Sequence, residues 1–226
     1  MKSKQLRLKT KTKPFLFQKK LTNLTKKNFE IVIARYDEDI TWSDNYKSFR
    51  TIYNKGCDDI EKPYIKLKNI GHLADTILRH IITNYDNLAD VTFFTHGSFN
   101  YRSDQLIKEN GKCHKYFKDF ICTDKNTLVY LENGRPPHKN TTFYNYPDTI
   151  GNIYKKIFNS EYCNNFSWCR GKIMSIGKNR IRKTSVEIYQ KMLDFIHEPY
   201  EGKEPSQHIY RTRGIFIERL IIKCFI

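Results

Sequence analysis

Hydrophobic positions in the first half of the chain alternate between strand-like and helix-like patterns. Residues 29–36 form a compact run rich in β-branched side chains, which is typical of a buried strand. Apolar residues then recur at near-helical spacing between residues 73 and 88, and predict a helix that opens at Gly71. The run 91–94 is too short for a helix and suits a second buried strand. Strands separated by helices favour an α/β fold with a partly parallel sheet.

The rest of the chain carries weaker patterns. Further strands are expected at residues 50–56, 128–131 and 171–176. The clearest helix spans residues 183–196, with Thr184 as its N-cap and Glu187 completing a capping box. A final helix is expected within residues 208–226. Two segments lack a clear period: residues 116–122 suggest one or two helical turns, and residues 139–165 look irregular.

Length and charge divide the chain into an arm and one domain. The 226 residues suffice for a single core, and we expect a basic arm over residues 1–28 followed by one domain over residues 29–226. The net charge of +16 favours an anionic partner such as nucleic acid, a lipid surface or a diphosphate-bearing molecule. The alternative is a lysine-rich composition produced by an AT-biased genome. Nucleic acid would bind through the arm, which has no acidic residue.

Cysteine spacing and hydropathy bear on the cellular compartment. The six cysteines are scattered and none forms a Cys-x-x-Cys pair, which argues against a zinc site. The basic N-terminus is not followed by the apolar segment of a secretory signal, and no apolar run is long enough to span a bilayer. We therefore expect reduced cysteines and a cytoplasmic location.

The order of the motifs resembles nucleotide-sugar glycosyltransferases of the GT-A fold. Two elements support this resemblance: a first strand that ends in Arg35-Tyr36-Asp37-Glu38-Asp39, and a helix opened by Asn69-Ile70-Gly71. More closely, the chain resembles a group of glycosyltransferase-like proteins found in fungi, bacteria and large DNA viruses. The further shared blocks are Trp42, Ile52-Tyr53-Asn54-Lys55-Gly56, Tyr85-Asp86-Asn87-Leu88, Arg180-Ile181-Arg182 and Glu218-Arg219-Leu220.

This resemblance implies a fold and an activity. The fold would be GT-A-like (Rossmann-like), with a mixed, mostly parallel sheet flanked by helices. The activity would be transfer of a sugar from a nucleotide-diphosphate donor to a glycan or glycoprotein acceptor. If the chain is viral, the setting would be virion or surface glycan synthesis in the host cytoplasm. The implied nucleotide-sugar contacts are Arg35, Tyr36, Asp37, Glu38, Asp39, Asn54, Lys55, Asn69, Gly71, Arg170 and Lys172.

Each of these candidate residues has a structural alternative: Arg170 and Lys172, for example, would clamp the diphosphate, or they belong to a solvated basic face. The acidic triplet Asp37-Glu38-Asp39 would bind the ribose or base, or it is a solvated turn with a helix-capping aspartate. Asn54 and Lys55 would contact the nucleotide, or they form a plain turn before a glycine. Glu218 would act as the general base with Arg219 on the acceptor side, or the two residues form a buried salt bridge.

The chain departs from the resemblance at the metal site. Thr95-His96-Gly97-Ser98 stands where an Asp-x-Asp motif would bind Mn²⁺ or Mg²⁺, and Asp104 follows. Three explanations are open: His96 and Asp104 hold the metal, basic residues neutralise the diphosphate without one, or this copy is an inactive scaffold. His96 is the sharpest single candidate, and its alternative is a hydrogen-bonded structural histidine. A basic nucleic-acid-binding protein remains the competing function.

Overall fold

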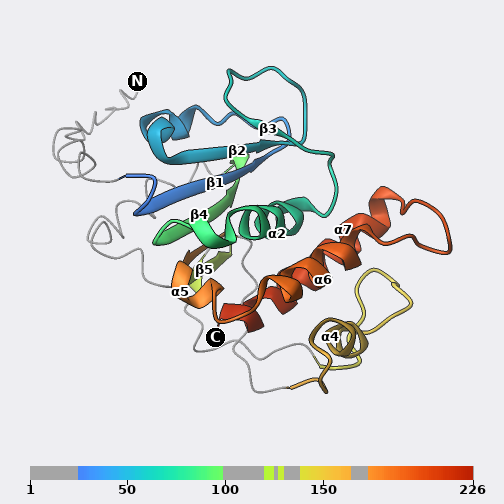
Figure 1. The fold of residues 1–226 in the computed structure, drawn as a ribbon. Helices are drawn as coiled ribbons and strands as arrows, with labels where there is room; N and C mark the ends of the chain where they lie inside the picture. The colour runs from blue at the N-terminus through green and yellow to red at the C-terminus, as the bar shows by residue number, and fades with distance from the viewer. Residues whose placement is uncertain (1–24, 99–119, 125–126, 130–137, 164–172, 226) are drawn as a thin grey trace, which may run out of the picture.

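The computed structural model describes residues 25–98, 120–124, 127–129, 138–163 and 173–225. It is an α/β structure in which helices cover a mixed sheet (Figure 1). The strands are β1 (Phe29–Arg35), β2 (Arg50–Asn54), β3 (Ile65–Lys66), β4 (Val91–His96), β5 (Phe120–Asp124), β6 (Thr127–Val129) and β7 (Ile173–Gly177). The helices are α2 (His72–Asn84), α4 (Ile150–Phe158), α5 (Lys178–Ile181), α6 (Val186–His197) and α7 (Gln207–Leu220), with 3₁₀ segments η1 (Thr41–Phe49), η2 (Tyr85–Asn87) and η6 (Ile221–Phe225).

The strand order confirms the expected mixed sheet. Within the described residues the seven strands follow the order β3-β2-β1-β4-β7-β5-β6. Strands β3, β2, β1 and β4 run parallel to one another, whereas β7 runs antiparallel between β4 and β5. The chain builds outward from β1 to β3, then returns through α2 to place β4 on the other side of β1. The direction of winding therefore reverses between β1 and β4.

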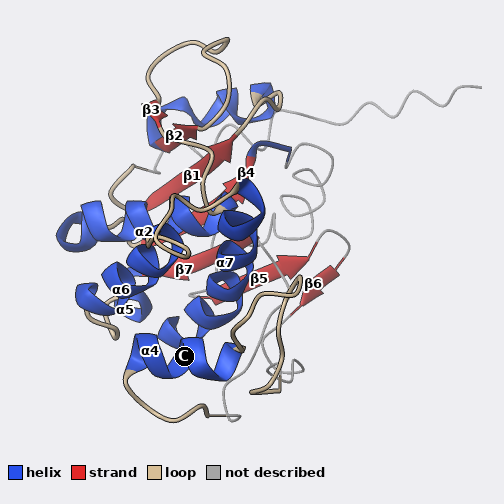
Figure 2. Ribbon diagram, turned by 90° about the vertical axis from the view of Figure 1, so that its right-hand side faces the viewer, coloured by secondary structure: helices blue, strands red, loops and turns tan. Residues whose placement is uncertain are grey.

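Strand β1 is apolar along most of its length because both of its faces are covered. Phe29, Ile31 and Ile33 pack in a cluster with residues of η1, while Val32 and Ala34 face the cluster formed with α2. Figure 2 shows the helices α2, α6, α7 and α4 gathered on one side of the sheet. Alternation along the strand thus assigns each residue to a layer.

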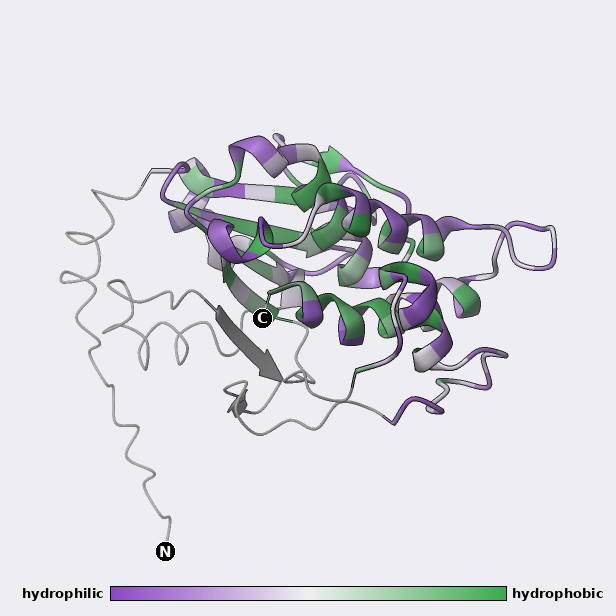
Figure 3. Ribbon diagram, turned by 60° about the horizontal axis from the view of Figure 1, so that its bottom comes forward, coloured by the Kyte–Doolittle hydropathy of each residue, from purple (hydrophilic) through white to green (hydrophobic). Residues whose placement is uncertain are grey.

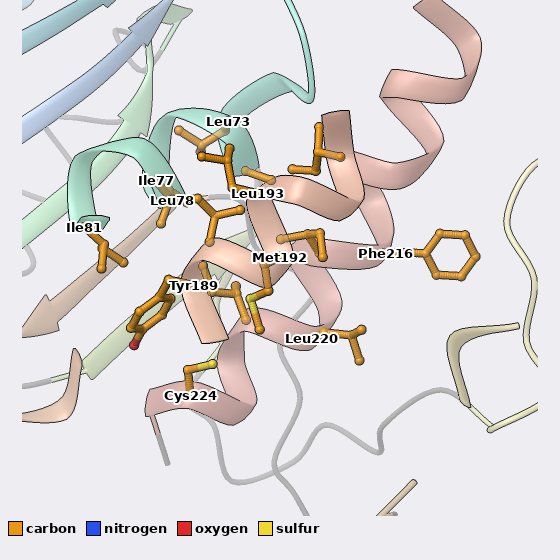
Figure 4. Packing of buried hydrophobic residues seen from close by; sticks show 14 of the residues in the cluster. Leu73, Ile77, Leu78, Ile81, Tyr189, Met192, Leu193, Phe216, Leu220 and Cys224 are labelled. Atoms are coloured by element: carbon orange, nitrogen blue, oxygen red, sulfur yellow. The ribbon is translucent and has the colours of Figure 1, made fainter. Parts of the chain in front are cut away.

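The larger core lies between the sheet and the helices that cover it, among them α2, α4, α6 and α7. Figure 3 shows hydrophobic and hydrophilic residues alternating along these helices, as amphipathic helices require. In the close view of Figure 4, Leu73 and Ile77 of α2 lie beside Leu193 of α6, whereas Phe216 of α7 points away from α2. No helix within the described ranges has the length and apolar content that a bilayer crossing requires.

A buried polar cluster interrupts the apolar layer between β1 and α2. The Glu30 carboxylate lies 3.5 Å from His80 Nε2 and accepts a hydrogen bond from the Thr51 hydroxyl. The His80 Nδ1 atom lies 3.2 Å from the Tyr53 hydroxyl. Burial raises the pKa of Glu30, but His80, Thr51 and Lys26 outweigh that effect and lower the pKa from 4.5 to about 2.

We expect the Glu30→Gln variant to lose about 2–3 kcal/mol of stability near neutral pH. Because the pKa of Glu30 falls from 4.5 to about 2 on folding, its contribution is present above pH 4.5 and disappears as the pH falls through 2. Urea unfolding at a series of pH values measures this difference. The two unfolding curves should converge in acid, and a gap that stays constant with pH would contradict the assignment.

Three sequence predictions are wrong. Residues 120–122 belong to β5, which pairs with β7, rather than to a helical turn; residues 116–119 lie outside the described ranges. The segment 139–165, predicted irregular, contains α4, which begins after an N-cap hydrogen bond between Thr149 Oγ1 and the Asn152 amide. The N-cap position of helix α6 is Ser185, which makes no side-chain capping bond, and the Thr184 hydroxyl donates instead to the Cys224 carbonyl, so the predicted capping box is absent.

Candidate functional site at the carboxyl ends of β1 and β4

The reversal of winding between β1 and β4 marks a candidate ligand-binding position. In open α/β sheets, ligands bind beyond the carboxyl ends of the strands at such a point. In the register of the sheet Ala34 of β1 lies opposite His96 of β4, so the loops that follow these two strands leave the sheet side by side. The sequence predictions at Arg35–Asp39 and at His96 therefore fall at one place, which we call the switch point.

The two loops contact each other directly. The Trp42 indole donates a hydrogen bond of 2.9 Å to the Gly97 carbonyl. The Glu38 carboxylate accepts a 2.6 Å hydrogen bond from the Tyr36 amide and lies so close to Gly97 that a Cβ there would stand 2.8 Å from Glu38 Oε2. Tyr36 is 50% exposed and is a large aromatic side chain left in solvent at the switch point.

The buried side chain of Arg35 holds the loops after β1 and β2 in place. Its side chain is 2% exposed, and its guanidinium donates to the carbonyls of two loops and to two side chains. The acceptors are Tyr36 O (3.1 Å), Glu38 O (3.0 Å), Asn54 Oδ1 (3.0 Å), Cys57 O (3.1 Å) and Asp59 Oδ1 (2.7 Å). Arg35 therefore joins the loop after β1 to the loop after β2.

The acidic triplet divides into three roles. Asp39 accepts hydrogen bonds from the Thr41 amide (2.8 Å) and the Thr41 hydroxyl (3.0 Å), which lower its pKa and hold the start of η1. Asp37 accepts a 3.1 Å bond from the Cys57 amide. Asp37 and Glu38 each use one carboxylate oxygen in these bonds to backbone amides. The second oxygen of each can accept a hydrogen bond from a ligand hydroxyl.

The loop after β2 is built around Asn54 and Gly56. Asn54 is buried, and its amide group donates to the Cys57 carbonyl (2.7 Å) and to Asp58 (3.2 Å). A Cβ on Gly56 would stand 1.6 Å from the Tyr36 carbonyl oxygen, closer than any side chain permits. The residue at position 56 must therefore be glycine for Tyr36 to keep its place.

Lys55 points away from the switch point into the start of α2. Its ammonium donates to the carbonyls of Ile70 (2.8 Å) and His72 (2.6 Å) and pairs with Asp75 at 3.1 Å. Burial holds the pKa of Lys55 below its ordinary value, although the charge of Asp75 opposes this effect. Asn69 is exposed, and Gly71 caps the helix with a φ of +60°. Lys55 thus fixes the helix start.

A pocket of about 440 Å³ opens beside these loops, between the Arg35–Thr41 segment, η1 and Asp59–Glu61. Six carboxylates and three basic residues line it, so its character is acidic. The acidic lining does not suit a diphosphate, but it suits hydroxyl or amide groups that donate hydrogen bonds. Arg170 and Lys172, predicted to hold the diphosphate, lie outside the described residues.

His96 lies at the end of β4 and is partly buried. The Ser98 hydroxyl lies 2.8 Å from His96 Nδ1 and fixes the orientation of the ring. Within the described ranges no group of three His, Cys, Asp or Glu side chains is placed to hold a metal ion, and Asp104 lies outside those ranges. The predicted site for Mn²⁺ or Mg²⁺ stays a prediction.

Glu218 and Arg219 lie in α7, one turn after Gly214. Gly214 packs against the Gly71 carbonyl, and Glu218 follows deeper in the helical layer with 1% of its surface exposed. A general base must reach the proton that it removes. Burial of Glu218 therefore favours the structural alternative over the acceptor-side base.

Sequence reasoning missed the residues that hold the two loops together. The Trp42 indole and the Gly97 carbonyl form a contact between segments 55 positions apart, and Asp59 pairs with Arg35 across 24 positions. The sequence shows Trp42 only as part of a shared block, and nothing near Asp59 marks it as a partner of a buried arginine.

The comparisons with known proteins identify a family but no activity. A family described as protein of unknown function (DUF3431) matches residues 31–212, which is most of the chain. Neither the curated proteins nor the solved structures gave a significant match. The matched range contains both loops of the switch point.

Proposed function

Since the chain belongs to DUF3431, a family of unknown function, we propose its activity from its own geometry: it is a glycosyltransferase that uses a nucleotide-diphosphate sugar. The acceptor is a glycan or a glycoprotein. The observation that carries this proposal is the switch point between β1 and β4, where an exposed aromatic ring stands beside two carboxylates. The proposal accords with the motif resemblance and with the mixed, mostly parallel sheet.

Each part of a nucleoside finds a matching group at this position. The Tyr36 ring is exposed and offers a face for stacking with the base. Asp37 and Glu38 accept hydrogen bonds from the ribose hydroxyls. Arg35 binds the carbonyls of Tyr36 and Glu38 from below, so the loop is organised before the ligand arrives.

The transfer itself breaks the bond between the anomeric carbon and the diphosphate oxygen and forms a bond from that carbon to the acceptor oxygen. The acceptor hydroxyl gives its proton to a general base, a carboxylate or histidine side chain, and the diphosphate leaves with the bonding electrons. We assign His96 to the reacting end of the donor, because it lies across the switch point from Ala34 and is oriented by Ser98. A metal, if His96 and Asp104 hold one, would supply the positive charge that neutralises the diphosphate; without it, the sequence prediction gives this role to Arg170 and Lys172, which lie outside the described residues.

A thermal-shift panel of UDP-, GDP-, dTDP- and CMP-sugars, with and without Mn²⁺, tests the proposal. One nucleotide family should raise the melting temperature by linkage. The Tyr36→Ala variant should lose about tenfold in affinity for that family, since stacking contributes about 1.4 kcal/mol. His96→Ala should remove any dependence on Mn²⁺ if His96 holds the metal.

Ile65→Ala is the matched control for Tyr36→Ala. Ile65 is another exposed apolar side chain, on β3 and away from the switch point, so its removal should leave nucleotide affinity unchanged. No shift with any donor, in protein shown to be folded, would contradict the proposal. So would equal affinities of wild type and Tyr36→Ala.

Oligonucleotide binding tests the competing function, that of a basic nucleic-acid-binding protein. Most of the predicted basic arm, residues 1–24, lies outside the described residues. Residues 25–28 are held at the start of β1, where the Phe29 amide donates to the Thr25 carbonyl and Asn28 donates to Asp90, so a deletion should end at residue 24. If the deletion removes all salt-dependent affinity for oligonucleotides, binding belongs to the basic segment and not to the folded domain.

A further inference from the structure

A tight turn over residues 143–146, in the loop that precedes α4, places Tyr144 in an unfavourable backbone conformation. The Tyr146 amide donates a 3.0 Å hydrogen bond to the Phe143 carbonyl and closes the turn. Both central residues have positive φ, +52° at Tyr144 and +57° at Asn145, as a type I′ turn requires. Glycine, asparagine and aspartate dominate such positions, whereas a bulky side chain there is strained.

Two aromatic residues hold the turn in place. The Phe143 ring packs edge-on against Phe216 of α7 with centroids 4.8 Å apart. The Tyr146 hydroxyl accepts a 2.9 Å hydrogen bond from the buried Arg213, and its ring also contacts Phe216. In Figure 4 the Phe216 side chain points away from α2. The turn is therefore anchored to α7 at both of its ends.

The Tyr144 ring itself is left in solvent. It is 54% exposed, the highest value among the large hydrophobic side chains of the described residues. Two polar residues from the first turns of α7 surround it: the Arg211 guanidinium lies 5.6 Å from the ring centroid, and the His208 ring lies 6.1 Å away, edge-on. His208 Nε2 lies 3.4 Å from the Tyr144 carbonyl. Arg211 therefore lies over one face of the ring and His208 stands at its edge, which leaves the other face open to a ligand.

We propose that Tyr144, with Arg211 and His208, forms a carbohydrate-binding platform that receives the acceptor glycan. The apolar C–H face of a pyranose ring stacks on the tyrosine ring, while its hydroxyls accept hydrogen bonds from the Arg211 guanidinium and donate to Nδ1 of His208, whose Nε2 is turned to the Tyr144 carbonyl. The acceptor role rests on the proposed glycosyltransferase activity. Sugar binding by the platform does not, and it can be measured alone.

The position of the platform fits this role. Helix α7 passes the start of α2 at Gly214, where its backbone contacts the Gly71 carbonyl at the carboxyl side of the sheet. Arg211 and His208 precede Gly214 by about one and two turns of the same helix. The platform therefore extends outward from the edge of the sheet that carries the switch point, and it is separate from the loop of Tyr36.

The strained backbone and the exposure of Tyr144 argue against a purely structural role for its ring. An exposed ring contributes little hydrophobic burial to stability, and a tyrosine normally avoids positive φ. Here the chain accepts both a strained backbone and an exposed aromatic side chain, although asparagine fits the same turn without strain. Strain of this kind persists where the side chain has a use that stability alone does not explain.

The Tyr144→Asn variant separates stability from binding. We expect its melting temperature to rise by about 2–4 °C, the change that relief of one strained residue gives in a chain of this size. Tyr144→Phe keeps the ring and the strain, so its melting temperature should match that of the wild type. A fall in the melting temperature of Tyr144→Asn would mean that the ring is structural and would overturn the proposal.

Binding is measured on a glycan array with the full chain and these two variants. The wild type and Tyr144→Phe should bind the same glycans, and Tyr144→Asn should bind them about tenfold more weakly. Absence of glycan binding by the wild type, or equal binding by Tyr144→Asn, overturns the platform.

A crossed measurement distinguishes this inference from the proposed function. Tyr36→Ala should lose nucleotide-sugar affinity and keep glycan binding, whereas Tyr144→Asn should show the reverse. Glycan binding through Tyr144 without any nucleotide binding would support the platform and refute the transferase. Nucleotide binding at Tyr36 without glycan binding would support the donor site and refute the platform.

Discussion

Replacing Asp75 with asparagine is expected to lower the free energy of unfolding by about 3–5 kcal/mol. The Asp75 carboxylate is 1% exposed, and the side chains of Lys55, Arg79 and His197 approach it to 3.1, 3.0 and 2.7 Å. Burial raises the pKa of Asp75, but the hydrogen bond with His197 and the charges of Lys55 and Arg79 outweigh it and hold the pKa below its ordinary value. Loss of this charge would leave the buried Lys55 ammonium without a counter-ion.

Urea unfolding near neutral pH measures this loss. Asp86→Asn is the matched control, because Asp86 is exposed and its replacement should change stability by less than about 0.5 kcal/mol. Adding Lys55→Met to Asp75→Asn should recover part of the loss, since it removes the uncompensated charge. Strictly additive losses in this double-mutant cycle would contradict an explanation by an orphaned ammonium.

The Gly56→Ala variant is expected to lose about 100-fold in affinity for the nucleotide sugar and about 1–3 kcal/mol of stability. The added Cβ would stand 1.6 Å from the Tyr36 carbonyl oxygen and 2.4 Å from Asp37 Oδ1. The first of these atoms is backbone, so a rotamer change cannot relieve the clash. The loop after β1 has to move, and Tyr36 moves with it.

Titration of the nucleotide sugar against melting temperature gives the affinity loss, and urea unfolding gives the stability loss. Cys57→Ala is the control, because the Cys57 side chain is exposed and its backbone amide makes the contact with Asp37. A Gly56→Ala protein that keeps wild-type affinity would show that the loop after β1 does not form the donor site.

Sequence patterns predict the elements whose apolar residues follow one period without interruption. Strands β1 and β4 and helix α2 are of this kind. Helix α4 escapes prediction although Ile150, Ile153 and Ile157 recur at helical spacing, because flanking asparagines and tyrosines hide its short stripe. Strand β5 depends on pairing with β7, a long-range contact that no local pattern records.

The position of the candidate site follows from strand order, but the roles of its residues do not. The sequence places Arg35 and Lys55 at strand ends, where a basic side chain can face either a phosphate or the interior. In the structure both residues direct donors to backbone carbonyls and buried acceptors. Side-chain direction at such a position depends on loops that fold back from elsewhere in the chain, so spacing alone cannot decide it.

The antiparallel insertion of β7 beside β4 has a consequence for the order of folding. The strands β1 to β4 come from one continuous stretch of chain, but β7 pairs with β4 only after about 80 intervening residues have looped back. The helices that cover α2 arrive later still, in the last part of the chain. During synthesis the apolar face of α2, with Leu73, Ile77 and Ile81, therefore stays uncovered until the C-terminal helices emerge, and exposed apolar surface of this kind favours aggregation.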